Sequence, residues 1–267
     1  MKRVFVSGAS SGIGLAIAKS LSGRGDEVWG TARSVDRIPS MPRLHAVPLD
    51  LCNTDSIENA FKLALSEAGY FDVLINNAGS GHFGPAELLS PEIMAHQFQV
   101  LLFGHVRLTQ LALAAMRTRD AGMIINVSSL AARLPVPFMG GYNAAKAALA
   151  MFTMSMQLEL SDSNIRMVDL QPADIHTEFN DDVIRSPDNA PHYQDRAAKT
   201  WDAVERNMKN APPPELVARR VAEIIDHPNP PPRVTIGAPF QTVIAPLIFR
   251  FLPQRLRLWG LKKYYGI

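Results

Sequence analysis

The sequence predicts an α/β fold, a single domain with a doubly wound parallel sheet of about seven strands and helices on both faces. Strand and helix signals alternate along most of the 267 residues, as in successive βαβ units. The apolar runs at 73–76 and 123–127 lack period-2 alternation, which is typical of parallel strands covered on both faces. A glycine-rich turn between the first strand and the first helix agrees with this fold class.

Each element is expected where its residue pattern is clearest. Short apolar or β-favouring runs predict strands at 4–6, 27–31, 44–48, 71–75, 123–127, 165–170 and 233–236. Helical patterns begin near Gly12 and recur at 54–68, 91–117, 140–160 and 214–226. Asn53 or Thr54 is the expected N-cap of the second helix, and Pro91 suits the first turn of the third.

The first turn contains glycines at positions 8, 12 and 14. Glycine is needed where the backbone takes positive φ or presses against a ligand, because a Cβ would clash there. The helix that follows directs free N–H groups and its positive dipole end at the turn. The turn therefore favours a phosphate-bearing ligand, although an ordinary strand-to-helix loop is the alternative.

Two segments depart from the regular alternation. A polar insertion covers residues 172–212, contains Pro172, Pro187 and Pro191, and leaves the carboxyl edge of the sheet, where ligands bind. We assign residues 1–240, including this insertion as a substrate loop, to one nucleotide-binding domain. Residues 241–267 form a separate apolar and basic tail.

The tail has two apolar stripes on different sides of a helix, Leu252, Leu256 and Trp259 on one and Leu258, Leu261 and Tyr265 on the other. A helix lying on a membrane should have one apolar face and one basic face. We therefore expect the tail to pack as a lid or between subunits. Peripheral membrane contact through its arginines, lysines and aromatic residues is the alternative.

Composition excludes several classes of protein. The chain is 47% hydrophobic and 19% charged, as in soluble globular proteins, and its net charge of +2 does not indicate a nucleic-acid partner. The single cysteine, Cys52, excludes an internal disulfide framework, and we expect a packed structural thiol. No signal-peptide h-region follows Lys2 and Arg3, and no run reaches the roughly 18 apolar residues of a membrane span. A cytoplasmic protein is expected.

Tyr142 and Lys146 lie four residues apart on a predicted helix, so both side chains project from one face. A nearby ammonium favours the phenolate and lowers the tyrosine pKa toward the range useful for proton transfer to a carbonyl oxygen. Ser129 follows the fifth strand at the same sheet edge, where its hydroxyl could bond that oxygen. The three residues predict carbonyl–alcohol chemistry.

With these motifs in this order, the chain resembles the short-chain dehydrogenase/reductase family over about residues 3–240, and its NADP-dependent members acting on carbonyl compounds, steroids and retinol in particular. The resemblance implies a Rossmann-type fold and a catalytic set of Ser129, Tyr142 and Lys146. It also implies a dinucleotide site made by Gly8, Ser10, Ser11, Gly12, Ile13, Gly14, Asp50, Leu51, Asn77, Ala78, Gly79, Tyr142, Lys146, Pro172, Ile175 and Thr177.

Two positions depart from the family pattern. Leu101 stands where the family commonly has an asparagine that helps to order a proton-relay water, and leucine forms no hydrogen bond. Ala173 replaces a glycine under the nicotinamide. The alternative to an active oxidoreductase is therefore an NADP(H)-binding protein of the same fold with impaired catalysis.

The residues after the second strand bear on the choice of cofactor. NAD-preferring family members have an acidic residue at the place of Ala32, and Arg33 follows it here. A guanidinium offers permanent charge and bidentate hydrogen bonds to a 2′-phosphate. We expect Arg33 to favour NADP(H), with NAD(H) as the alternative cofactor.

The remaining expectations concern the substrate, metals and assembly. Residues 130–141 are mostly apolar around Arg133, which favours a hydrophobic carbonyl or alcohol substrate. His82 could line the substrate cleft or be a solvated loop residue, His176 is expected to be positional, and no metal site is expected. The helices at 91–117 and 140–160 carry more apolar residues than one face needs, which predicts a homodimer or homotetramer.

Overall fold

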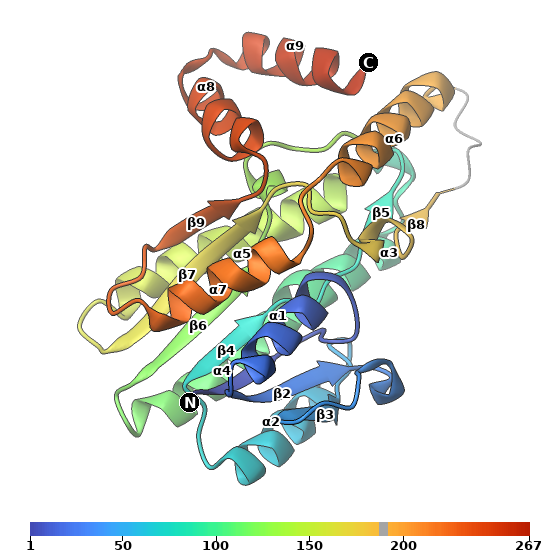
Figure 1. The fold of residues 1–267 in the computed structure, drawn as a ribbon. Helices are drawn as coiled ribbons and strands as arrows, with labels where there is room; N and C mark the ends of the chain where they lie inside the picture. The colour runs from blue at the N-terminus through green and yellow to red at the C-terminus, as the bar shows by residue number, and fades with distance from the viewer. Residues whose placement is uncertain (187–191) are drawn as a thin grey trace.

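Seven parallel strands form one sheet in the order β3-β2-β1-β4-β6-β7-β9 in the computed structural model, which describes residues 1–186 and 192–267 (Figure 1). The chain runs outward from β1 to β3 and then returns to β4 on the other side of β1, so the sheet is doubly wound and the predicted fold class is confirmed. The strands are β1 Arg3–Val6, β2 Glu27–Ala32, β3 Leu44–Pro48, β4 Val73–Asn76, β6 Gly122–Val127, β7 Ile165–Pro172 and β9 Arg233–Ile236. A small second sheet pairs β5 (His82–Phe83) with β8 (Ile184–Arg185).

The α-helices are α1 Gly12–Gly23, α2 Thr54–Ala68, α3 Pro91–Phe98, α4 Gly104–Arg117, α5 Gly140–Glu159, α6 Gln194–Lys209, α7 Glu215–Asp226, α8 Ala245–Phe251 and α9 Gln254–Tyr265. Short 3₁₀ turns occupy η1 Val35–Arg37, η2 Ala86–Leu88, η4 Leu130–Ala132 and η5 Glu178–Asn180, and π-helical segments occupy η3 Gln99–Phe103 and η6 Phe240–Ile244. Asn53 is the N-cap of α2, as expected, because its side chain accepts a hydrogen bond from the Ser56 N–H.

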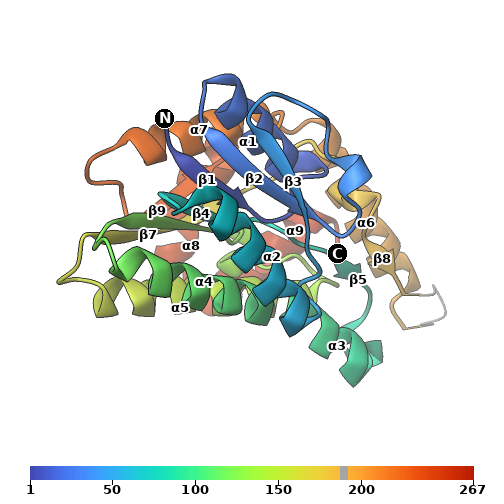
Figure 2. The same ribbon diagram turned by 90° about the horizontal axis from the view of Figure 1, so that it is seen from below.

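Helices cover both faces of the sheet (Figure 2). Val4 and Val6 face the layer that contains α1 and α7, whereas Phe5 between them belongs to the opposite core, with α2 and α4. Every second side chain of a strand points to the same face, so a single short strand supplies both cores. This explains the continuous apolar runs in the sequence.

The predicted helix at 91–117 is continuous but not uniformly α-helical, because η3 inserts a π-helical turn between α3 and α4. Single π turns occur frequently at functional sites. By length and hydropathy alone this stretch could span a membrane, although it contains no uninterrupted apolar run of that length. Its fully buried Leu108 packs in the core between the sheet and the layer of α2 and α4, as expected for a core helix. The length and hydropathy of this stretch are therefore only weak evidence for a membrane span.

The insertion at 172–212 has secondary structure of its own. It contains η5, β8 and α6, and β8 pairs with β5 beside the turn that follows β4. Pro187 and Pro191, two of the prolines that mark the insertion in the sequence, lie outside the residues that the structure describes. Val183 and Trp201 of the insertion form a small apolar cluster with Phe83 and Met139.

The tail forms α8 and α9, which lie beyond the sheet, and α9 contacts α6 (Figure 1). The Nδ2 of Asn207 in α6 donates a 2.9 Å hydrogen bond to the Tyr264 hydroxyl in α9. Gln241 donates a second hydrogen bond of 3.1 Å to the same hydroxyl. The first of these hydrogen bonds connects the insertion directly to the tail, whereas the second lies within the tail.

Candidate active site

One cavity of about 540 Å³ lies at the carboxyl edge of the sheet. Parallel strands bring their carboxyl ends to one edge, so segments far apart in sequence meet there. The cavity is lined by every residue that the sequence predicts for the site: Gly8, Ser10, Ser11, Gly12, Ile13, Gly14, Arg33, Asp50, Leu51, Asn77, Ala78, Gly79, Ser129, Tyr142, Lys146, Pro172, Ile175 and Thr177.

The glycine turn requires glycine for two distinct reasons. Gly8 and Gly12 have φ angles of +72° and +52°, which side-chain-bearing residues rarely adopt. A Cβ on Gly8 would lie 2.7 Å from the Cα of Ala78, and one on Gly14 would lie 1.9 Å from the carbonyl oxygen of Gly8. The backbone thus forms a tight cradle at the start of α1.

Residues that directly follow β1 and β4 hold this cradle in place. The Ser7 hydroxyl accepts hydrogen bonds from the N–H groups of Asn77 (2.9 Å) and Ala78 (3.1 Å). The Asn77 amide donates to the carbonyl oxygens of Ser7 (3.0 Å) and Gly8 (3.1 Å). The sequence analysis missed Ser7; its place directly before the first glycine is the one signal that could have revealed it.

The cradle fits the phosphates of a dinucleotide. The N-cap residue of α1, Ser11, makes no capping hydrogen bond with its side chain, so the first N–H groups of the helix remain available to an anion. At the far end of the groove, exposed Arg33 and Arg37 flank the end of β2. Arg37 was not predicted, although a second arginine four residues after Arg33 is visible in the sequence.

Cys52 lies at this end of the cavity and is exposed, so the expectation of a packed thiol is wrong. Partial burial and the neighbouring Asp50 carboxylate raise the pKa of the Cys52 thiol. The neutral thiol is therefore favoured, and Cys52 is not an activated nucleophile.

The catalytic candidates come from β6 and from the first turns of α5. Ser129 follows β6, and its Oγ accepts a 3.1 Å hydrogen bond from the Ala131 N–H, which leaves the hydroxyl proton free to donate. The Lys146 Nζ donates a 2.7 Å hydrogen bond to the carbonyl oxygen of Val127 and lies 5.9 Å from the centre of the Tyr142 ring. All three predicted groups face the same cavity.

Burial is the main cause of the pKa shifts of Lys146 and Tyr142. It lowers the pKa of Lys146 to about 8, against the opposing charge of Asp169. It raises the pKa of Tyr142, and the Asp174 carboxylate adds to that shift while the Ser129 hydroxyl opposes it. The expectation that Lys146 brings the pKa of Tyr142 below its usual value is therefore not met; the phenol is held as a proton donor.

Leu101 lies in η3 and is fully buried beside the cavity. Its Cδ2 lies 3.4 Å from the place that a Cβ on Gly79 would occupy. One turn later, both ring nitrogens of fully buried His105 lack a hydrogen-bond partner among the described residues, as does the Oδ1 of Asn76. Burial lowers the pKa of His105 to about 3, and the Lys146 charge adds to that shift, so the imidazole is neutral.

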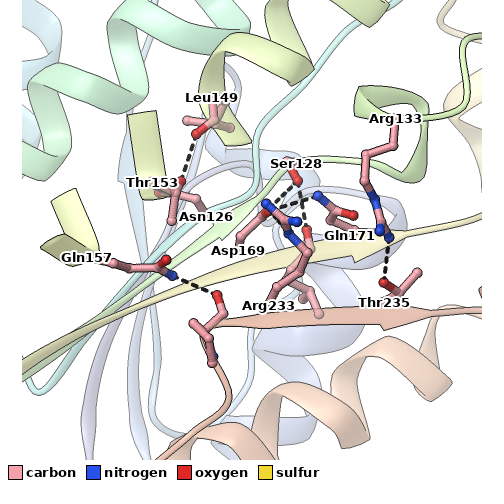
Figure 3. A network of polar contacts seen from close by, with 12 residues as sticks. Asn126, Ser128, Arg133, Leu149, Thr153, Gln157, Asp169, Gln171, Arg233 and Thr235 are labelled. Atoms are coloured by element: carbon pink, nitrogen blue, oxygen red, sulfur yellow. Dashed lines mark hydrogen bonds and ion pairs between the residues drawn. The ribbon is translucent and has the colours of Figure 1, made fainter. Parts of the chain in front are cut away.

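A polar network underlies the catalytic edge and joins β6, β7 and β9 (Figure 3). The buried Asp169 carboxylate accepts hydrogen bonds from Ser128, from Gln171 (2.7 Å) and from Arg233 (2.9 Å). Arg133 donates to Thr235 at 3.0 Å and so turns away from the cavity. These residues carry no predicted catalytic role, but they fix the strand ends that present Ser129.

The other end of the cavity is apolar. From the predicted 130–141 segment, Leu134, Val136 and Met139 line it, whereas Phe138 packs against Phe83 instead. The remaining apolar lining comes from the insertion and from the tail: Phe179, Val204, Met208, Phe240, Ile248, Phe249, Leu252, Leu256, Leu261, Tyr264 and Tyr265. The sequence analysis expects the insertion to be a substrate loop and the tail to be a lid or interface, and both segments line this end of the cavity.

The two histidine candidates have structural positions. His82 is buried, does not line the cavity, and its Nε2 lies 2.8 Å from the Ser186 hydroxyl, so both predicted roles for it are wrong. It instead fastens the insertion to β5. His176 contacts the Met208 carbonyl through Nδ1 at 3.1 Å, which agrees with a positional role.

Known proteins match this chain along most of its length. The family described as short chain dehydrogenase matches residues 2–188. A 3-ketodihydrosphingosine reductase of Bacteroides thetaiotaomicron is 30% identical over 266 residues, which cover 99% of this chain and 98% of that protein. A short-chain dehydrogenase structure from Streptomyces avermitilis has a TM-score of 0.83 at 27% identity and covers 98% of this chain and 96% of its own. An alcohol dehydrogenase from Thermococcus sibiricus, complexed with 5-hydroxy-NADP, has a TM-score of 0.74 at 25% identity. The match covers 91% of this chain and 97% of that chain.

Proposed function

Because this chain belongs to the short-chain dehydrogenase/reductase family and is thus an NAD(P)-dependent oxidoreductase acting on CH–OH groups, we propose that it prefers NADP(H) and interconverts a lipophilic ketone or aldehyde with its alcohol. The observation that carries this proposal is one continuous cavity that contains both the glycine turn and the catalytic residues. It runs from Arg33 past Tyr142 to the apolar wall of the insertion and the tail.

The proposed roles follow from the geometry. The bound nicotinamide supplies or accepts the hydride. Tyr142 gives its proton to the carbonyl oxygen, and the Ser129 hydroxyl donates to the same oxygen. The Lys146 ammonium, held by Val127, supports the charge that develops on the phenol and binds the nicotinamide ribose.

The NADP(H) preference rests on Arg33 and Arg37, the two cationic side chains at the adenosine end, where no acidic residue takes the place of Ala32. The Thermococcus sibiricus relative was solved with an NADP derivative, which agrees with this choice. The test compares kcat/KM for NADPH and NADH with one ketone. A higher value for NADH would reject the preference.

The lipophilic substrate rests on the apolar wall and on the relative named as a 3-ketodihydrosphingosine reductase. A series of 2-ketones of increasing chain length tests it. Each buried methylene contributes ~0.8 kcal/mol, so kcat/KM should rise by up to about fourfold per methylene until the cavity is filled. A flat series would reject a lipid-like substrate.

The second candidate function is NADP(H) binding with impaired catalysis, which the buried Leu101 favours. NADPH binding without turnover across the ketone and aldehyde panel would support it. The complete set of Ser129, Tyr142 and Lys146 around one cavity supports the active enzyme instead.

We also propose a cytoplasmic homodimer or homotetramer, formed through the outer surfaces of η3 and α5. Met151, Met154 and Leu158 on α5 are 58%, 41% and 74% exposed, and Phe103 in η3 is 53% exposed. Apolar side chains gathered on one surface mark an interface. Light scattering should give twice or four times the chain mass of 29.3 kDa, and a monomer would contradict the proposal.

A further inference from the structure

The C-terminal helices divide their apolar side chains between two environments. One set lines the cavity that reaches Tyr142, among them Phe249, Leu252, Leu256 and Tyr265. The other set is exposed and lines no part of that cavity; we call it the outer tail face, formed by Val243, Ile244, Leu247, Phe251, Leu258 and Trp259. Each of the two stripes expected from the sequence is split, because Trp259 and Leu258 face outward while the rest line the cavity.

The exposure of the outer tail face is high. Phe251 is 74%, Val243 63% and Trp259 62% exposed. Scattered apolar residues are normal on a protein surface, but six within the consecutive segments η6, α8 and α9 indicate an interaction surface. The α8 and α9 helices also project beyond the sheet, away from α2 and α4 (Figure 1).

The charged residues of the C-terminal segment are all basic. Residues 240–267 contain five arginines and lysines and no aspartate or glutamate, whereas the rest of the chain is net acidic, since the whole chain carries only +2. Cations lie beside outer aromatic rings: Lys263 Nζ is 5.3 Å from the Trp259 ring and the Arg250 guanidinium 5.8 Å from the Phe251 ring. Aromatic and cationic side chains together suit the boundary between anionic headgroups and acyl chains.

We propose that the outer tail face binds the surface of an anionic membrane and opens the apolar end of the cavity toward the lipid. A second copy of the chain fits this surface less well, because a two-fold contact would bring the like charges of two tails together. The proposal takes up the membrane contact that the sequence analysis gives as the alternative, while the inner side of the tail still lines the cavity, as a lid would. Entry of substrate from the bilayer rests on the proposed lipophilic substrate, but membrane binding does not.

Vesicle co-sedimentation of the full chain with NADPH tests the binding. Vesicles of phosphatidylcholine with about one-third phosphatidylserine should retain the protein, and pure phosphatidylcholine should retain far less. Lys262→Gln/Lys263→Gln should lower the partition coefficient about thirtyfold, at roughly 1 kcal/mol per cation. Phe251→Ser/Trp259→Ser should lose binding, whereas the matched exposed pair on α2, Lys62→Gln/Leu63→Ser, should bind as the wild type does.

Three results would overturn the proposal: no binding to anionic vesicles, equal loss in the α2 control, or a Phe251→Ser/Trp259→Ser protein of smaller mass in light scattering, which would identify a second copy as the occupant. Activity separates this inference from the proposed function. The outer-face variants should keep wild-type turnover of a water-soluble short ketone and lose turnover of a long-chain ketone embedded in anionic vesicles. Loss of both activities would count against a membrane role, whereas an inactive wild type that still binds vesicles would reject only the proposed function.

Discussion

The Nζ of Lys146 donates a 2.7 Å hydrogen bond to the carbonyl oxygen of Val127, which anchors the ammonium group at the end of β6. The group is buried, and burial lowers its pKa to about 8. Lys146 is therefore charged at neutral pH but loses its proton well below the usual pKa of a lysine. Any step that needs the ammonium depends on pH in this range.

We predict that carbonyl reduction slows as pH rises through about 8, the pKa of Lys146. In Lys146→Arg the guanidinium stays protonated, so the falling limb of the pH–rate profile, the range in which the rate declines, should move to higher pH, where Tyr142 itself titrates. The pH dependence of kcat for both proteins measures this. A limb at the same pH in the variant would show that another group controls it.

Asp169→Asn should shift the same limb to lower pH, because the Asp169 charge raises the pKa of Lys146. It should also lower the free energy of unfolding by about 1–3 kcal/mol, since Ser128, Gln171 and Arg233 lose a charged acceptor. Glu223→Gln breaks an exposed ion pair with Arg220 and should cost less than about 1 kcal/mol. Urea unfolding compares the two, and equal losses would contradict a special role for Asp169.

The fold and the central site could be predicted because they follow from local patterns. Tyr142 and Lys146 share a helix face through their four-residue spacing, and the apolar runs define the strands. Contacts between distant segments leave no such periodic signal. Examples are the hydrogen bond of Asn207 to Tyr264 and the pairing of β5 with β8. The π turn at Leu101 could not be predicted from the sequence either, because its apolar residues follow the same pattern as an ordinary α-helix.

His105→Phe should make the protein less sensitive to acid. The pKa of His105 is lowered to about 3 in the folded state, so the unfolded chain binds the extra proton and stability falls as pH drops from about 6.5 toward 3. Phenylalanine cannot bind this proton, and it replaces two ring nitrogens that have no hydrogen-bond partner among residues 1–186 and 192–267. Urea midpoints at neutral and acidic pH measure the effect; an unchanged pH dependence in the variant would contradict it.

Arg33→Ala/Arg37→Ala should lower kcat/KM for NADPH by about 10- to 100-fold, because hydrogen bonds to charged groups contribute ~1.5–3 kcal/mol. The value for NADH should change little, since NADH lacks the 2′-phosphate. Steady-state kinetics with both cofactors provide the internal control. Equal losses for NADPH and NADH would mean that the arginines do not select the phosphate.

Tyr142 is the proposed proton donor, and its replacement by phenylalanine gives the most direct measurement. Tyr142→Phe keeps the ring that packs 5.7 Å from Phe179 and removes only the hydroxyl. In a single turnover of NADPH with a long-chain ketone, followed by NADPH absorbance, the rate should fall by about 10²–10⁴-fold while the NADPH dissociation constant stays nearly unchanged. A Tyr142→Phe protein that binds NADPH and reduces the ketone within about threefold of the wild-type rate would contradict proton transfer from Tyr142.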